Sequence, residues 1–177
     1  MRHKTIEIYL FEELSDSAKE KARMWYRTGS EYPWGEESIS SLKAFAEWFG
    51  VEIRNYSLGG SDNRSQGVEW RLNIDDALAD LKGVRLWKYL NNHFLLPKLD
   101  GSCPFTGYCM DEVLLDPIRE FMTRPNQSED YEGMIEESIH RFCKSYADDV
   151  DYYYSDEQVD ESIIANEYEF LEDGSRA

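Results

Sequence analysis

Residues 131–154 read YEGMIEESIHRFCKSYADDVDYYY, and this stretch decides the fold class more than any other. Its apolar side chains recur every three or four residues, which is the spacing that places them on one face of an α-helix. They are Ile135, Ile139, Phe142, Cys143, Tyr146, Val150 and Tyr153. The sequence therefore predicts a long helix from Tyr131 to about Tyr154 and a helical C-terminal half.

Further helices follow from the same spacing and from residues that cap helix ends. One begins after Ser15 or Ser17 and stops at Gly29, and another carries Leu42 and Phe45 and is closed by Gly50. A third covers 75–96 with a break near Gly83, a fourth covers 110–122 with Pro117 in its first turn or at a kink, and a fifth is capped at Ser155-Asp156.

Four segments alternate apolar and polar residues, as strands with one wet face do. They are 5–10, 51–58, 68–74 and the shorter 168–170. These segments predict an α+β fold in which a small antiparallel sheet of three to four strands packs against several helices. Its apolar face should meet the helices that carry Trp25, Phe45 and Phe142, and strands from the two ends of the chain should meet in that sheet.

Length and composition favour one α+β domain over residues 1–177, with an acidic helical portion from about residue 129. Apolar residues make up 41% of the 177 residues, which is enough for a core, yet no stretch reaches the roughly 20 apolar residues that span a bilayer. The first residues lack the apolar block of a signal peptide, so we expect a cytoplasmic protein. The three cysteines are expected to be free thiols.

The formal net charge of −17 is unevenly distributed. Residues 1–128 hold 20 acidic side chains against 16 Lys and Arg, whereas residues 129–177 hold 16 against 3. Such a surface repels nucleic acid and anionic membranes and attracts a basic partner. The charge therefore predicts no direct nucleic-acid binding, no membrane binding and a protein partner with a basic surface.

Four segments carry a resemblance: 9–26 (with LFEELS and AKEKAR), Phe105-Thr106-Gly107-Tyr108 with Met110-Asp111, Leu115-Asp116-Pro117, and 165–174 (ANEYEFLEDG). They resemble a family of small, acidic, uncharacterised proteins carried by bacteriophages, prophages and plasmids. The resemblance touches both ends and the middle of the chain and brings no catalytic residues with it. It implies a mobile-element origin, and small accessory proteins of that origin often act on host machinery or host defence systems.

Cysteine and histidine give two enzymatic or metal-binding alternatives. Zinc could be held by Cys103, Cys109, His140 and Cys143, but neither pair has finger or ribbon spacing, and Cys143 falls in the apolar stripe. A cysteine nucleophile needs an adjacent base such as His93 or His140, and no local motif surrounds the cysteines. We therefore expect no metal, no cofactor and no catalytic residues, and leave open whether these side chains meet in space.

Acidic and aromatic residues together form the preferred candidate site. The acids lack the spacing of a calcium loop, and the glycine-rich stretch 58–62 lacks the helix and lysine of a phosphate loop. Three consecutive tyrosines on a helix cannot all face inward, so at least one of 152–154 should be exposed beside the carboxylates. The predicted partner-binding residues are Asp148, Asp149, Asp151, Tyr152, Asp156, Glu157, Asp160 and Glu161.

These observations favour a non-enzymatic accessory protein that binds and inhibits or modulates a host protein, with its carboxylates standing in for nucleic-acid phosphates. The alternatives are a small hydrolase or metal-dependent enzyme that uses the Cys/His or carboxylate cluster, and a homo-oligomeric accessory protein without a host target. The identity of the target and the oligomeric state do not follow from the sequence.

Overall fold

The computed structural model describes residues 6–93 and 101–177, and its chain forms two compact units. The first unit combines Met1–Pro33 with Val150–Ala177, and the second is Trp34–Asp149. The first holds β1 (Tyr9–Leu10), the 3-10 helix η1 (Phe11–Glu13), α1 (Asp16–Gly29), α7 (Asp156–Ala165) and β4 (Glu169–Phe170). The second holds α2 (Gly35–Trp48), β2 (Val51–Ser57), β3 (Gly67–Leu72), α3 (Asp76–Ala79), α4 (Gly83–His93), α5 (Met110–Thr123) and most of α6 (Tyr131–Tyr153). Whether the chain behaves as a single domain stays a prediction.

The first unit joins the two ends of the described chain in one small sheet. β1 pairs antiparallel with β4, so that Tyr9 lies opposite Phe170 and Leu10 opposite Glu169. The prediction that strands from both ends meet is thereby confirmed. The core beneath the sheet is formed by residues of η1, α1, α7 and β4, namely Phe11, Leu14, Ala18, Ala22, Val159, Ile163 and Phe170.

Local capping explains where the helices α1 and α7 of this unit begin. Ser15 Oγ accepts a hydrogen bond from the Ala18 N–H at 3.4 Å, and Ser155 Oγ accepts one from the Gln158 N–H at 3.3 Å. These bonds satisfy backbone donors that a helix start leaves unpaired. Both caps were predicted, with Ser15 the residue used of the two candidates.

The prediction of one antiparallel sheet of three to four strands is confirmed only in part, because the strands that the structure describes form two antiparallel sheets of two strands each, β1–β4 and β2–β3. The N-terminal strand is also shorter than predicted, and its alternating apolar side chains do not face a core. Ile6, Ile8 and Leu10 are 56%, 52% and 47% exposed, while Phe11 is buried. Alternation sets which side chains share a face of a strand, but it does not say which face is covered. In β1 it is Tyr9, on the face opposite to Leu10, that packs against the core of the first unit.

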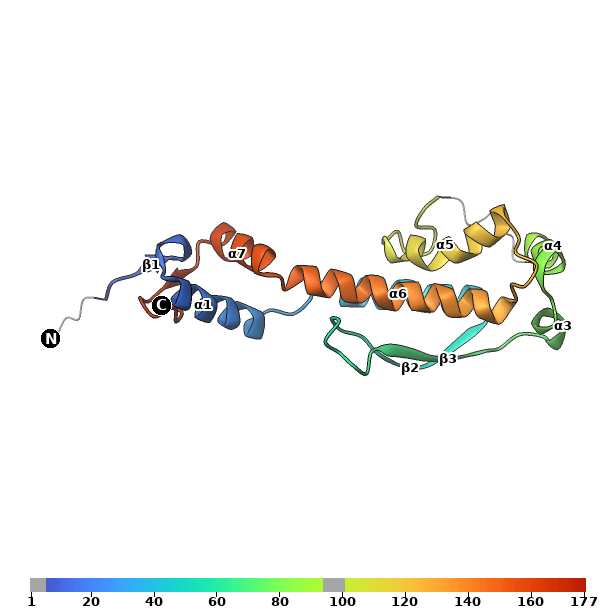
Figure 1. Cartoon of the computed structure of the whole chain (residues 1–177), viewed down its shortest axis with the longest axis horizontal. Coiled ribbons are helices and arrows are strands. Elements are labelled where there is room, and N and C mark those ends of the chain that lie inside the picture. The colour runs from blue at the N-terminus through green and yellow to red at the C-terminus, as the bar shows by residue number, and fades with distance from the viewer. Residues whose placement is uncertain (1–5, 94–100) are drawn as a thin grey trace. The chain divides into compact units, whose positions relative to one another are not determined.

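The second unit is built around α6, with α5 and the β2–β3 hairpin on different sides of it in Figure 1. The hairpin pairs antiparallel from Val51 opposite Leu72 to Ser57 opposite Gly67, with an irregularity between Ile53 and Asn55. Helices supply most of the fully buried side chains of this unit, among them Leu42, Phe45, Leu86, Leu90, Leu114, Ile118, Ile135 and Phe142. The α+β class and the hairpin are therefore confirmed.

Helix bounds in this unit follow the predicted pattern with one correction. Gly50 follows α2 with a φ of 65°, and the break near Gly83 separates α3 from α4. Pro117, however, lies in the middle of α5 and not in its first turn. The predicted helical residues 94–96 lie outside the described part of the chain. Among the described helices, none combines the length and the apolar composition that crossing a membrane requires.

Candidate functional site

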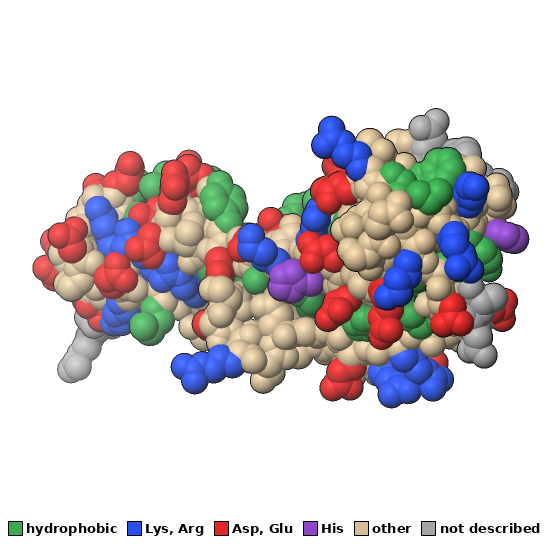
Figure 2. All heavy atoms as spheres, turned by 45° about the vertical axis from the view of Figure 1, so that its right-hand side comes forward, with side chains coloured by type: hydrophobic (Ala, Val, Ile, Leu, Met, Phe, Trp, Pro, Cys, Tyr) green, Lys and Arg blue, Asp and Glu red, His purple; other side chains and the backbone are tan. Residues whose placement is uncertain are grey.

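The eight residues predicted to bind a partner are divided between the two units. Asp151, Tyr152, Asp156, Glu157, Asp160 and Glu161 belong to the first unit, and Asp148 and Asp149 belong to the second. Of the six in the first unit, all except Asp160 are exposed. On the face drawn in Figure 2, each unit carries Asp and Glu side chains interspersed with Lys and Arg side chains. The charge available to a partner therefore depends on which acids are paired with Lys or Arg, and not only on the number of acids.

Two of the predicted acids are paired inside the first unit, a contact that the sequence analysis missed. The Arg23 guanidinium of α1 donates two hydrogen bonds to Asp160, from Nε to Oδ1 at 2.7 Å and from Nη2 to Oδ2 at 2.7 Å. Arg27 binds Asp156 through Nη2 and donates from Nε to the Tyr154 carbonyl at 2.9 Å. A sequence signal existed, because Arg23/Arg27 and Asp156/Asp160 both have the four-residue spacing of one helix face.

This pairing changes the electrostatics of the two carboxylates. The hydrogen bond from Arg27 is the main cause that lowers the pKa of Asp156, and the charge of Arg23 acts in the same direction. The pKa of Arg23 is raised in turn, chiefly by its hydrogen bonds to Asp160. The side chain of Asp160 is 26% exposed, against 62% for Asp156. Asp160 is thus a structural contact between α1 and α7, whereas Asp156 still borders solvent.

The remaining acids of α7 present their charge outward. Glu157 and Glu161 lie four residues apart on the helix, and both are exposed. Glu161 accepts a hydrogen bond from Gln158 Nε2 at 3.0 Å, and Glu157 has no side-chain hydrogen bond or ion pair to any residue that the structure describes. Because these two carboxylates have no cationic partner in the part of the chain that the structure describes, they are the best placed on α7 to meet a basic surface.

Tyrosines 152–154 behave as the helix geometry predicts. Tyr152 is 61% exposed, which confirms that at least one of the three faces solvent. Tyr154 donates from its hydroxyl to the Ser30 carbonyl at 2.9 Å, and Tyr153 packs edge-on against Tyr32 with ring centroids 5.7 Å apart. Tyr152 is therefore the aromatic side chain that the helix leaves available beside the acids.

Asp148 and Asp149 lie in the second unit and differ from the α7 acids. Asp148 is exposed and lies 3.9 Å from the Lys144 ammonium, while Asp149 is half-buried. Burial is the main cause that raises the pKa of Asp149, and the charge of Asp148 adds to it. That these two residues join the first-unit acids in one binding surface stays a prediction.

The cysteines and histidines do not join in a metal-binding cluster among the residues described. Within residues 6–93 and 101–177, no group of three or more His, Cys, Asp and Glu side chains could hold a metal ion. All three cysteines are free thiols, and burial raises the pKa of Cys143. His93 stacks on Tyr89 with ring centroids 4.3 Å apart and His140 is exposed.

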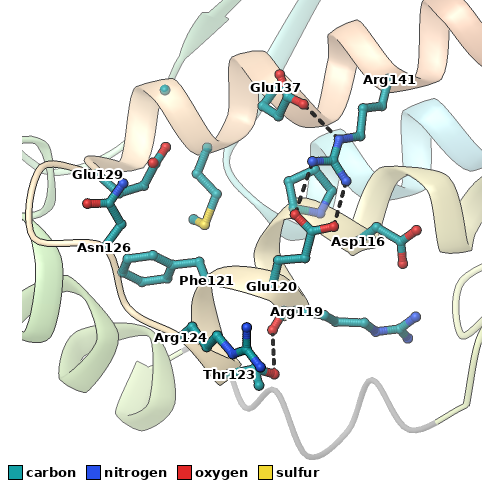
Figure 3. Close-up of a pocket in the computed structure, with 13 residues that line it drawn as sticks. Asp116, Arg119, Glu120, Phe121, Thr123, Arg124, Asn126, Glu129, Glu137 and Arg141 are labelled. Carbon is teal, nitrogen blue, oxygen red and sulfur yellow. Dashed lines mark hydrogen bonds and ion pairs between the residues drawn. The ribbon is translucent and has the colours of Figure 1, made fainter.

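A cleft of about 880 Å³ lies between α5 and α6 in the second unit, and it was not predicted (Figure 3). Its main electrostatic feature is Arg141 of α6, which reaches across to α5. Arg141 donates to both oxygens of Glu120 at 2.8 and 3.0 Å and to Glu137 at 2.7 Å. Hydrogen bonding to Arg141 lowers the pKa of Glu120. The contacts of Arg141 with Glu120 thus tie α6 to α5, and the direction of the shift is opposite to the one that would make Glu120 a general acid.

Comparison of the chain with protein-family models, with curated proteins and with solved structures finds no match.

Residues 105–111, one of the segments on which the expected resemblance rests, have a structural role. Asp111 at the start of α5 is fully buried, and its Oδ2 accepts hydrogen bonds from the backbone N–H groups of Phe105, Thr106 and Gly107 at 2.9, 2.7 and 3.2 Å. The Thr106 hydroxyl donates to Oδ1 at 2.9 Å. A buried carboxylate with this many donors fixes a loop, so Asp111 positions the segment that precedes α5.

Proposed function

We propose that this protein is a non-enzymatic accessory protein of a mobile genetic element that binds a basic surface of a host protein through the first unit. The observation that carries this proposal is the charge of that unit. It contains 15 acidic residues against seven Lys and Arg, a formal net charge of −8, whereas the second unit reaches −9 over almost twice the length.

The contacts within the first unit divide its acids into two roles. Asp156 and Asp160 face Arg27 and Arg23, so much of their charge is balanced inside the unit. Glu157 and Glu161 face solvent without a cationic partner among the described residues. In the proposal, the paired acids hold α7 in place on α1, and Glu157 and Glu161 provide the long-range attraction that steers a basic partner.

Tyr152 adds apolar contact area to the proposed surface, which carboxylates do not provide. Tyrosine is enriched at protein–protein interfaces because it combines an apolar ring with a hydrogen-bonding hydroxyl. An exposed tyrosine next to the exposed Asp151 gives the proposed surface both apolar and charged contacts. The surface is therefore defined here as Asp151, Tyr152, Asp156, Glu157 and Glu161.

A nucleic-acid-binding groove of a host protein is the proposed target of this acidic surface. Carboxylates on a rigid helix can occupy the positions where such a groove holds phosphates, and occupation of the groove would inhibit the host protein. The resemblance to proteins of phages, prophages and plasmids supports a target in the host cytoplasm, with a defence system as one such target. The same charge argues against direct binding of duplex DNA or an anionic membrane.

The proposal is tested by capturing host proteins from a lysate on the immobilised full chain at low and high salt. We expect a basic, nucleic-acid-binding protein to be retained at low salt and released as the salt concentration rises, because exposed charges are screened. Duplex DNA added in excess should compete for the same partner. Retention that neither salt nor DNA reduces would contradict the proposal.

A further inference from the structure

A second cleft, of about 400 Å³, lies at the C-terminal end of α2 in the second unit. Among the residues that the structure describes, eight line it: Glu47, Trp48, Gly50, Asn73, Ile74, Asp75, Leu78 and Tyr89. None of the eight is Lys, Arg or His. The size is within the range of small-ligand sites, at its lower end, and gives room for one long side chain.

A tight backbone contact builds one wall of this cleft. Gly50 follows the end of α2 with a φ of 65°, and its carbonyl accepts a hydrogen bond from the Asn73 N–H at 2.7 Å. A Cβ at position 50 would lie 3.0 Å from Ile74 Cγ2 and 3.1 Å from the Asn73 carbonyl oxygen. Glycine therefore lets the segment after β3 approach the end of α2, and this brings Asp75 to the same cleft as Glu47.

Three sources of negative potential meet at this cleft. Glu47 and Asp75 are both exposed carboxylates, and neither has a side-chain hydrogen bond or ion pair to another described residue. The third source is the end of α2, since the C-terminal carbonyls of a helix carry a partial negative charge and favour cations. The cleft is thus suited to a positively charged ligand.

The aromatic residues Trp48 and Tyr89 of the cleft favour one class of cation, the guanidinium group. Trp48 is 38% exposed, and Tyr89 is held by its stack on His93. Tryptophan and tyrosine rings attract cations over their faces, and a planar guanidinium stacks on them better than an ammonium does. A guanidinium also offers several N–H donors in a fixed arrangement that carboxylates accept.

From this combination we infer that the cleft at the end of α2 binds the side chain of an arginine residue in a peptide or protein. The guanidinium stacks on Trp48 or Tyr89 and donates to Glu47 and Asp75, and its aliphatic part lies against Leu78 and Ile74. This inference does not rest on the proposed function, because the cleft belongs to the second unit and the proposed surface to the first.

The test titrates the full-length protein with N-acetyl-arginine amide and follows the indole N–H resonance of Trp48 by NMR. The resonance is assigned with a Trp48→Phe variant. N-acetyl-citrulline amide, which is neutral and has nearly the same shape, is the control ligand. We expect the arginine compound to shift the Trp48 resonance saturably. Its affinity should be at least roughly threefold higher than that of the citrulline compound, because one exposed contact of a cation with an aromatic ring or a carboxylate contributes about that much.

Two double variants separate the cleft from general electrostatic attraction. Glu47→Gln/Asp75→Asn removes the two carboxylates of the cleft, and Glu69→Gln/Asp62→Asn removes two exposed carboxylates elsewhere in the second unit. We expect the first variant to weaken arginine binding by roughly threefold or more and the second to leave it within about twofold. Equal affinity for citrulline and arginine, or an equal loss in both variants, would overturn the inference.

Discussion

At the scale of single residues, Gly174 shows how closely the last turn of the chain approaches α1. It is buried, has a φ of 81°, and a Cβ at this position would lie 2.1 Å from the Ala18 carbonyl oxygen. That distance is far shorter than a van der Waals contact of a Cβ atom, and relief would require a shift of the α1 backbone. The glycine therefore lets the C-terminal turn close over the helix.

Replacement of Gly174 by alanine is expected to destabilise the first unit by about 2 kcal/mol or more, through strain at positive φ and displacement of the turn from Ala18. Thermal unfolding and amide exchange in α1 and α7 measure the effect. Gly29→Ala is the matched control, because nothing lies within 4 Å of its Cβ position. An equal effect of both substitutions would show that the close approach is unimportant.

Asp111 gives a second prediction at this scale. Asp111→Ala leaves the N–H groups of Phe105, Thr106 and Gly107 without their acceptor, and we expect a loss of about 3 kcal/mol in the free energy of unfolding. Urea denaturation followed by circular dichroism measures it. The exposed neighbour Glu112 provides the control, since Glu112→Ala should cost less than about 1 kcal/mol. A small loss for Asp111→Ala would mean that water replaces the carboxylate.

At the scale of elements, the ion pairs Arg23–Asp160 and Arg27–Asp156 connect α1 to α7. We expect the stability that such ion pairs give to the first unit to fall in acid. Arg27 and Arg23 lower the pKa of Asp156, and a hydrogen bond from Lys21 is the main cause that lowers the pKa of Asp173. A carboxylate with a lowered pKa in the folded state stabilises the fold above its unfolded pKa, about 3.9 for aspartate. That contribution is lost as the pH falls from there through the lower, folded pKa.

We therefore expect the first unit to lose stability below about pH 4, by a modest amount because both carboxylates are well exposed. In an Arg27→Gln variant the loss between neutral pH and pH 3 should be smaller, since the pKa of Asp156 is no longer held down by Arg27. Arg54→Gln, in the second unit, should behave like the unmodified protein. Thermal unfolding across this pH range is the measurement, and identical acid sensitivity of all three proteins would refute the pairing.

The same scale shows what the sequence could predict and why. Helices are set by local signals, so the caps at Ser15 and Ser155 and the stop at Gly50 follow from nearby residues. The hairpin of β2 and β3 also joins neighbouring segments. Pairing between distant strands is not local, and the alternation of Ile6, Ile8 and Leu10 could not reveal that these side chains stay exposed while Tyr9 packs against the core.

The candidate site was predictable to the same extent. The exposure of Glu157, Glu161 and Tyr152 follows from helix periodicity and composition. The contact of Asp156 and Asp160 with α1 requires knowing which helices pack together, and so does the cleft at the end of α2. Residue type and spacing thus located the charge, but tertiary structure decided which charges are balanced.

At the scale of the whole molecule, the central claim is that Glu157 and Glu161 on α7 guide a basic partner to the first unit. A charge-reversal test must leave Asp160 unchanged, because its replacement would break the contact with Arg23. Glu157→Lys/Glu161→Lys meets this condition. Glu132→Lys/Glu136→Lys on α6 is a close control, since it changes the net charge equally, has the same four-residue spacing and also begins in the first turn of a helix.

The decisive measurement is the retention of the captured host protein by these two variants at low salt, with thermal unfolding to confirm that both fold. The account predicts that Glu157→Lys/Glu161→Lys folds and loses at least roughly tenfold in affinity, while the control keeps its partner within about twofold. A folded Glu157→Lys/Glu161→Lys protein that retains the partner as well as the control does would contradict the claim.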